Sequence, residues 1–240
     1  MTEPLIQIDD LSFAYPDGTA ALAGVSLRIA AGEKVALAGA NGAGKSTLLQ
    51  LLCGSLAGLP APWTGSIRAF GLPVEKGNLR EIRRRMGIVF QNPDDQLFCP
   101  TVFDDVAFGP RNMKLADGEI RERVTTALAA VGLAGFERRT SYHLSMGEKK
   151  RAAIATVLSM RPDVLALDEP TSMLDPRGRR EIRDLLRQLG GTQIIVTHDL
   201  AMIGELCDRV VVLSKGRVAA DGPPAEVLAN QTFLEAHGLA

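Results

Sequence analysis

The sequence predicts an α/β fold in which parallel strands alternate with helices and an antiparallel part comes first. Short apolar runs alternate with longer mixed stretches over most of the chain, which is the pattern of strands and amphipathic helices. A glycine-rich loop at residues 39–46 stands between one apolar run and one helical stretch. Two carboxylates end the apolar run that starts at Val164, and α/β sheets bind ligands at the carboxyl ends of such strands.

Composition narrows the class of protein. The 240 residues suffice for one large α/β domain or two small ones, and a hydrophobic content of 46% supports a buried core. A net charge of -1 leaves no electrostatic footprint for nucleic acid, so no nucleic-acid partner is expected. Cys53, Cys99 and Cys207 follow no metal-ligand spacing, which favours reduced thiols in a cytosolic protein. Without a signal pattern or a run of roughly 18 apolar residues, we expect a soluble chain that reaches a membrane only by docking onto another polypeptide.

The N-terminal part is predicted to be antiparallel. Residues 5–9, 11–15 and 25–29 are short, partly alternating segments that Asp-Asp, Pro-Asp-Gly and glycine turns separate. Tyr15 ends the second segment, where its ring could stack on a flat nucleobase or cover the sheet. A buried strand is expected at residues 34–38.

The rest of the chain alternates as an α/β fold requires. Further strands are expected at residues 66–70, 87–90, 164–170, 193–196, 209–213 and 216–219, and loops at 60–65 and 71–77. Helices are expected at residues 46–52, 79–85, 102–109, 117–131, 147–160, 177–189 and 224–229. Asp117 is the expected N-cap of its helix, and Gly132 its end. The basic run at 79–85 is interpreted as a solvated helix face rather than a nucleic-acid surface.

The loop at residues 39–46 matches the spacing G-x-x-x-x-G-K-[ST]. Glycines let the backbone fold around anionic oxygens with its N–H groups pointing inward, and the following helix adds its positive end. Lys45 would bring a full charge to the outer phosphates, and Ser46 would hold Mg²⁺. A chance match has a probability under about 1%, so nucleoside triphosphate binding is predicted. The residues expected to bind the nucleotide here are Gly39, Asn41, Gly42, Gly44, Lys45, Ser46 and Thr47.

Polar side chains at two other strand ends complete this chemistry. Asp168 is suited to supporting Mg²⁺, and Glu169 to orienting or deprotonating a water molecule. His198 follows the strand at 193–196 and is predicted to contact a γ-phosphate, although a lone histidine is usually structural.

These motifs resemble, in order and over essentially the whole chain, the ATP-binding cassette (ABC) ATPases. Residues 39–46 resemble Walker A, and Asp168 with Glu169 resembles Walker B with its catalytic glutamate. The remaining matches are Tyr15 with the adenine-stacking aromatic, Gln91 with the Q-loop glutamine, residues 144–148 with the signature motif, residues 172–175 with the D-loop, and His198 with the switch histidine.

The resemblance implies one ABC ATPase domain over residues 1–240, with a RecA-like core, an antiparallel β subdomain and an inserted α-helical subdomain at about 92–160. It also implies a head-to-tail homodimer that sandwiches two ATP molecules, in which Ser145 and Gly147 act on the nucleotide of the other copy. The implied catalytic residues are Glu169, His198, Gln91 and Lys45, and the implied Mg²⁺ ligands are Ser46, Gln91 and Asp168.

The chain departs from the family pattern at three positions. Met146 replaces a glycine of the signature motif and could not adopt a glycine-only conformation without cost. Glu148 replaces a glutamine and would bring a carboxylate near phosphates, which could weaken closure on ATP. Met173 replaces the small residue common in the D-loop.

Residues 90–98, 106–110 and 147–151 resemble the energy-coupling factor branch, and most of all its cobalt-type ATPase subunit. That resemblance implies an importer for cobalt, or for nickel, with the chain on the cytoplasmic face, held by an integral membrane coupling subunit and a substrate-binding membrane subunit. Asp94 and Asp95 could form a groove for basic residues of the coupling subunit, or be a hydrated acidic turn that caps a helix.

Other functions remain open at this point. A vitamin importer of the same branch, for biotin for instance, would use nearly the same ATPase. A soluble ABC ATPase acting as a mechanical clamp usually carries tandem cassettes, coiled coils or basic arms, which this sequence lacks. A P-loop kinase is disfavoured by the signature motif, the D-loop and His198 together.

Overall fold

The computed structural model describes residues 3–56 and 63–239 and divides the chain into two compact units. The first unit comprises Met1–Arg83 and Gly190–Ala240, and the second comprises Arg84–Leu189. Each unit is described by itself below. Part of the loop predicted at 60–65, residues 60–62, lies outside the described residues.

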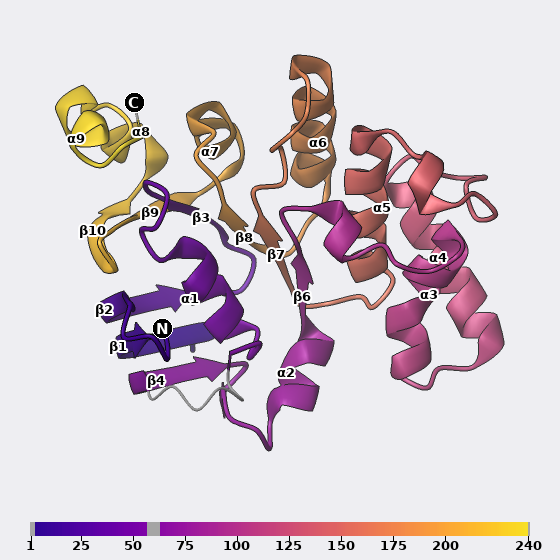
Figure 1. Cartoon of the computed structure of the whole chain (residues 1–240), viewed down its shortest axis with the longest axis horizontal. Coiled ribbons are helices and arrows are strands. Elements are labelled where there is room, and N and C mark those ends of the chain that lie inside the picture. The colour runs from indigo at the N-terminus through magenta and orange to yellow at the C-terminus, as the bar shows by residue number, and fades with distance from the viewer. Residues whose placement is uncertain (1–2, 57–62, 240) are drawn as a thin grey trace. The chain divides into compact units, whose positions relative to one another are not determined.

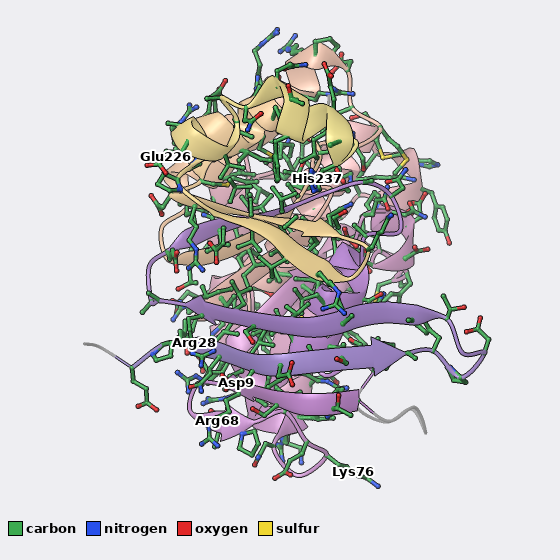
Figure 2. The ribbon with its side chains drawn as sticks, turned by 90° about the vertical axis from the view of Figure 1, so that its left-hand side faces the viewer. Asp9, Arg28, Arg68, Lys76, Glu226 and His237 are labelled. Carbon is green, nitrogen blue, oxygen red and sulfur yellow. The ribbon has the colours of Figure 1, made fainter. Side chains whose placement is uncertain are left out.

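An antiparallel sheet forms the N-terminal part of the first unit, as predicted. Its strands follow the order β2, β1, β4, β5, with the first three side by side in Figure 1. Their bounds are β1 (Ile6–Ala14), β2 (Ala20–Ile29), β4 (Trp63–Ala69) and β5 (Leu72–Pro73). The short β5 lies where a loop was expected at 71–77, so that prediction was wrong for two residues. On the outer face, Arg28 of β2 forms an ion pair with Asp9 of β1 (Figure 2).

The predicted turn between residues 5–9 and 11–15 is wrong, because both segments belong to β1. Asp10 has a left-handed backbone with φ 48°, and the register against β2 shifts between Ile8 and Leu11. Aspartate tolerates this conformation better than most residues, and the Asp10 N–H donates to the Ser26 hydroxyl at 3.0 Å. The two aspartates therefore make an irregularity within one strand instead of a turn between two.

The parallel strands of the first unit are centred on β3. β3 (Lys34–Ala38) pairs with β8 (Thr192–Val196) on one side and β9 (Arg209–Ser214) on the other, and β10 (Arg217–Gly222) adds an antiparallel edge to β9. Val35, Ala36, Leu37 and Ala38 are fully buried, as expected for a strand covered on both faces. The helices of this unit are α1 (Lys45–Leu52), α7 (Leu200–Leu206), α8 (Pro224–Val227) and α9 (Gln231–Ala236). The sequence did not predict α7 and α9, which are short.

The second unit joins two parallel strands to a set of helices. β6 (Met86–Val89) pairs with β7 (Val164–Asp168). The helices are α3 (Val102–Asn112), α4 (Asp117–Ala130), α5 (Met146–Leu158) and α6 (Pro176–Gln188), with short 3-10 turns η1 (Pro93–Asp95) and η2 (Ser141–His143). α3, α4 and α5 lie together in Figure 1, within the residues of the predicted helical subdomain. α2 (Leu79–Arg85) spans the junction between the two units in the sequence, at the predicted residues.

Several predicted helix ends were wrong in this unit, such as that of α5, which ends at Leu158 instead of residue 160. The N-cap of α4 is Ala116, and Asp117 is instead its first helical residue. α3 continues past Gly109 through Pro110 to Asn112. Proline has no N–H to bond the carbonyl four residues earlier. In this helix, the Val106 carbonyl accepts from the Ser159 hydroxyl of α5's C-cap at 2.8 Å, which replaces the missing bond.

In the part of the chain that the structure describes, every helix is too short or too polar to cross a membrane.

Candidate functional site

The glycine-rich loop links β3 to α1 and needs glycine at two positions. Gly39 has φ 141° and Gly44 has φ 102°, both in the region that side chains disfavour. A Cβ atom on Gly39 would approach the Leu213 carbonyl oxygen to 2.1 Å, and one on Gly44 would approach the Ala21 carbonyl oxygen to 2.5 Å. The loop can therefore close tightly only because both residues lack a side chain.

Lys45 begins α1 and turns back into this loop. Its side chain is 8% exposed, and Nζ donates to the carbonyl oxygens of Gly39 at 2.7 Å and Ala40 at 2.9 Å. Gly44 caps the helix without a side-chain hydrogen bond, and the first turn carries no acidic residue. Asn41, Gly42 and Ser46 are exposed. The N-terminus of α1 carries the positive end of the helix dipole, Lys45 and no acidic residue in its first turn, which suits the binding of a polyphosphate.

Tyr15 is tied to the same loop by a contact that the sequence did not reveal. Its hydroxyl group lies 2.9 Å from the Thr47 hydroxyl of α1, and its ring meets the Phe13 ring edge to face at 5.1 Å. The contact with Phe13 is the sheet-covering role that was one of two interpretations of this residue. Stacking on adenine stays a prediction.

His198 lies beside the loop at the same sheet edge. β3 and β8 are parallel with Leu37 paired to Val196, and the Thr197 N–H donates to the Leu37 carbonyl at 3.2 Å. The residue after Thr197 therefore stands next to Gly39, where the loop begins. His198 is exposed at this edge. In the first unit, Tyr15 contacts α1 and His198 follows the strand beside β3, so both lie near the glycine-rich loop.

In the second unit, Asp168 ends β7 and Glu169 follows with an unusual backbone. Glu169 is 8% exposed and has φ 45°, a conformation that is costly for a residue with a side chain. Its carbonyl oxygen accepts from the Ser172 N–H at 3.0 Å, which closes a turn after the strand. Gln91 is exposed just after β6, the strand that pairs with β7. Asp168, Glu169 and Gln91 therefore lie at the carboxyl ends of two neighbouring strands.

Lys150 is the residue of this site that sequence reasoning missed. It is 1% exposed, and Nζ donates to the carbonyl oxygens of Gln91 at 2.6 Å and Glu169 at 3.2 Å and to the Ser172 hydroxyl at 3.2 Å. Burial lowers the pKa of Lys150 to about 8, and the nearby carboxylates of Glu169 and Asp168 oppose that shift. A signal was present, because Lys150 has the same helical spacing as the buried Ile154 and Val157.

The predicted signature residues lie at the start of α5. Ser145 is the N-cap, and the Met146 backbone is helical, so the replacement of glycine costs no left-handed strain there. A Cβ atom on Gly147 would meet nothing within 4 Å, which leaves open space beside the helix end. Glu148 closes a capping box with Ser145. Its carboxylate thus has a local structural role that the sequence comparison with the family did not suggest.

The segment after Gln91 is anchored on α5. Gln96 accepts from the Phe90 N–H at 3.0 Å and donates to the Ala153 carbonyl at 3.0 Å. Asp94 accepts from Lys149 Nζ at 2.6 Å. Asn92 caps η1 by accepting from the Asp94 N–H. The cap thus comes from Asn92 and not from the aspartates that the sequence analysis considered, and Asp94 forms an ion pair with α5.

Comparisons with known proteins identify the family of this chain. The ABC transporter family matches residues 22–172. The energy-coupling factor transporter ATP-binding protein EcfA of Carboxydothermus hydrogenoformans is 50% identical over 237 residues, which cover 98% of this chain and 86% of the relative. The structure of CbiO1 from Clostridium perfringens, a protein described as part of the ABC transporter complex CbiONQ, is 42% identical with a TM-score of 0.85 and covers 99% of this chain and 96% of that one.

A second solved structure is more distant. The ATP-binding cassette MJ0796, in a dimeric post-hydrolysis state bound to ADP and Pi, is 27% identical with a TM-score of 0.79, covering 91% of this chain and 98% of that one. The predicted α/β fold of an ABC ATPase is thereby confirmed. With a family match over more than half of its length and a relative at 50% identity, the chain belongs to the ATP-hydrolysing ABC proteins, and within them to the energy-coupling factor branch.

Proposed function

We propose that this chain is the ATP-hydrolysing subunit of an energy-coupling factor importer that takes up a transition metal ion, cobalt or else nickel. The observation that carries the proposal is the likeness over 99% of the chain to CbiO1, a member of a transporter complex. Residues 90–98 and 147–151, which resemble the cobalt-type ATPase, support the metal as substrate.

The proposed chemistry divides among the residues of the two units. Lys45 and the loop N–H groups bind the phosphates of ATP, and Tyr15 stacks on adenine. Glu169 polarises the attacking water molecule, while His198 and Gln91 contact the γ-phosphate. Water activation by a carboxylate requires that its position be defined, and Glu169 is buried on a turn closed by Ser172.

Mg²⁺ fits the donor chemistry proposed for it. The hydroxyl of Ser46, the side-chain amide oxygen of Gln91 and the carboxylate of Asp168 are all oxygen donors, which Mg²⁺ prefers. When bound, the ion neutralises charge on the phosphates.

The proposed assembly is a homodimer on the cytoplasmic face of the membrane. Ser145 and Gly147 of each copy would complete the nucleotide site of the other, with the N-terminus of α5 turned toward the γ-phosphate. The dimeric state of MJ0796 supports this pairing. The integral membrane coupling subunit and the substrate-binding membrane subunit would hold the dimer in place, and ATP-driven closure and opening would transmit the energy.

The test is affinity purification of a Glu169→Gln variant from its native membranes with ATP and Mg²⁺ present, with wild type in ADP as the control. Co-purification of two small integral membrane proteins and of bound cobalt or nickel supports the proposal. If the same membrane proteins co-purify with a bound vitamin instead, the substrate is that vitamin and not a metal ion. A protein that brings down only cytosolic partners would instead be a soluble clamp.

The contact with the coupling subunit is proposed to include Asp94 and Asp95. Asp94 already pairs with Lys149, and both carboxylates are exposed. Exposed carboxylates on a segment anchored to α5 are suited to basic side chains of a partner. If charge reversal of both residues leaves co-purification with the membrane proteins intact, this contact surface is wrong.

A further inference from the structure

Lys150 buries a positively charged ammonium group inside the second unit. An ammonium group has three N–H donors and loses its hydration on burial, so each donor needs an acceptor. The three acceptors here are backbone carbonyls and a hydroxyl group instead of a carboxylate. The site therefore differs from an ordinary ion pair, which would fix one partner.

The acceptors come from three separate segments. Gln91 lies 59 residues before Lys150, Glu169 lies 19 residues after it, and Ser172 lies 22 residues after it. One side chain of α5 thus joins the segment after β6, the end of β7 and the following turn. Lys150 therefore holds the backbones of Gln91 and Glu169 and the side chain of Ser172.

Of the three groups that Lys150 binds, the Glu169 backbone has a left-handed conformation that needs to be held in place. Its φ of 45° is a strained conformation, and such residues persist when their surroundings hold them. The Glu169 carbonyl accepts from both the Ser172 N–H and Lys150 Nζ. Removal of the lysine would take away one of these two bonds to the turn that positions the Glu169 carboxylate.

We propose that Lys150 is a positioning residue for ATP hydrolysis, which holds the backbones of Gln91, Glu169 and Ser172 against α5 so that Glu169 is aligned for its reaction. The inference rests on the role proposed above for Glu169. It also gives α5 a link to that residue, because Ser145 at the helix start and Lys150 belong to one rigid element. A displacement of α5 would therefore move Lys150 and the turn after Glu169 together.

The experiment compares Lys150→Met and Lys150→Gln with a matched control, Lys149→Met, in the full chain. Lys149 is the adjacent residue on α5 and pairs with Asp94, three residues after Gln91, so Lys149→Met controls for the loss of a lysine charge and of one ion pair to the segment after β6. Steady-state ATP hydrolysis should show a fall in kcat of about 100-fold for Lys150→Met, the scale expected when a reacting group is misplaced by about 1 Å. The KM for ATP should stay within about threefold, because Lys150 does not belong to the phosphate loop. Lys150→Gln keeps two N–H donors and should lose only about tenfold in kcat.

Amide hydrogen exchange separates positioning from general stability. In Lys150→Met, exchange should speed up at Ser172 and its neighbours, while the α5 amides from Ala152 to Val157 keep their protection. A kcat within threefold of wild type would overturn the proposal, and so would loss of protection along all of α5. If Lys150→Met does not fold, Lys150→Gln carries the same two measurements.

A Glu169→Gln variant distinguishes failure of this inference from failure of the assigned role. If that variant hydrolyses ATP at the wild-type rate, the role of Glu169 is wrong. The exchange measurement still decides whether Lys150 holds the three segments.

Discussion

The carboxylate of Glu148 accepts two hydrogen bonds from Ser145, one from the backbone N–H at 2.7 Å and one from the hydroxyl group at 2.8 Å. The Ser145 oxygen in turn accepts from the Glu148 N–H at 3.3 Å. The hydroxyl proton of the proposed signature serine is therefore directed toward Glu148 in this structure. A phosphate oxygen that accepts a hydrogen bond from the Ser145 hydroxyl group therefore has to compete with the Glu148 carboxylate.

Replacement of Glu148 by glutamine should ease this competition. Glutamine can still close the capping box, so the free energy of unfolding should change by less than about 0.5 kcal/mol. Removal of the negative charge should lower the KM for ATP severalfold. Steady-state hydrolysis and urea denaturation measure the two effects, with Glu226→Gln on α8 as a charge-matched control. An unchanged KM would mean that Glu148 does not affect closure on ATP.

The capping box should also make stability depend on pH. The hydrogen bonds from Ser145 lower the pKa of Glu148 below its ordinary value of 4.5. A carboxylate with a lowered pKa in the folded state stabilises the fold above its unfolded pKa and loses that contribution as pH falls through the folded value. The stability difference between wild type and Glu148→Gln should therefore be constant near neutral pH and shift against wild type below about 4.5. Urea denaturation from pH 7 to 4 tests this, and a parallel decline of both proteins would contradict it.

Two substitutions of Tyr15 separate the contribution of its hydroxyl group from that of its ring. Tyr15→Phe removes the bond to Thr47, which should cost about 1 kcal/mol of stability while ATP affinity changes less than about twofold. Tyr15→Ala also removes the ring, and if the ring stacks on adenine the affinity should fall roughly tenfold. Titration with a fluorescent ATP analogue gives the affinities. Equal affinities for both variants would leave the ring with its sheet-covering role.

Ser159 and Pro110 form a pair whose effects should not add. Ser159→Ala leaves the buried Val106 carbonyl without its hydroxyl donor and should cost about 1–3 kcal/mol. Pro110→Ala supplies a backbone N–H four residues after Val106, so in that background the same serine substitution should cost less. Denaturation of the two single variants and the double variant closes the cycle. Purely additive losses would mean that the hydroxyl group bonds mainly to the Thr156 carbonyl, which lies at 2.9 Å.

Local features of the site could be predicted from the sequence because they depend on neighbouring residues. The loop from Gly39 to Ser46 needs glycine at fixed positions between a strand and a helix, and spacing alone conveys that. The positions of Asp168 and Glu169 at the end of an apolar run follow in the same way. Predictions based on single polar residues were weaker, because Asp9 and Asp10 look like a turn and are an irregularity within β1.

The sequence by itself determined the phosphate loop, the order of the motifs and the α/β class, since each is a pattern of adjacent or periodically spaced residues. The tertiary structure decided that Lys150 is buried and which three groups it binds. Those acceptors lie 19 to 59 residues away along the chain, and no local preference selects them. The packing of α5 against the ends of β6 and β7 brings these acceptors within reach of Lys150. A buried ammonium group is stable only where all its N–H donors have acceptors, so the burial of Lys150 depends on this packing.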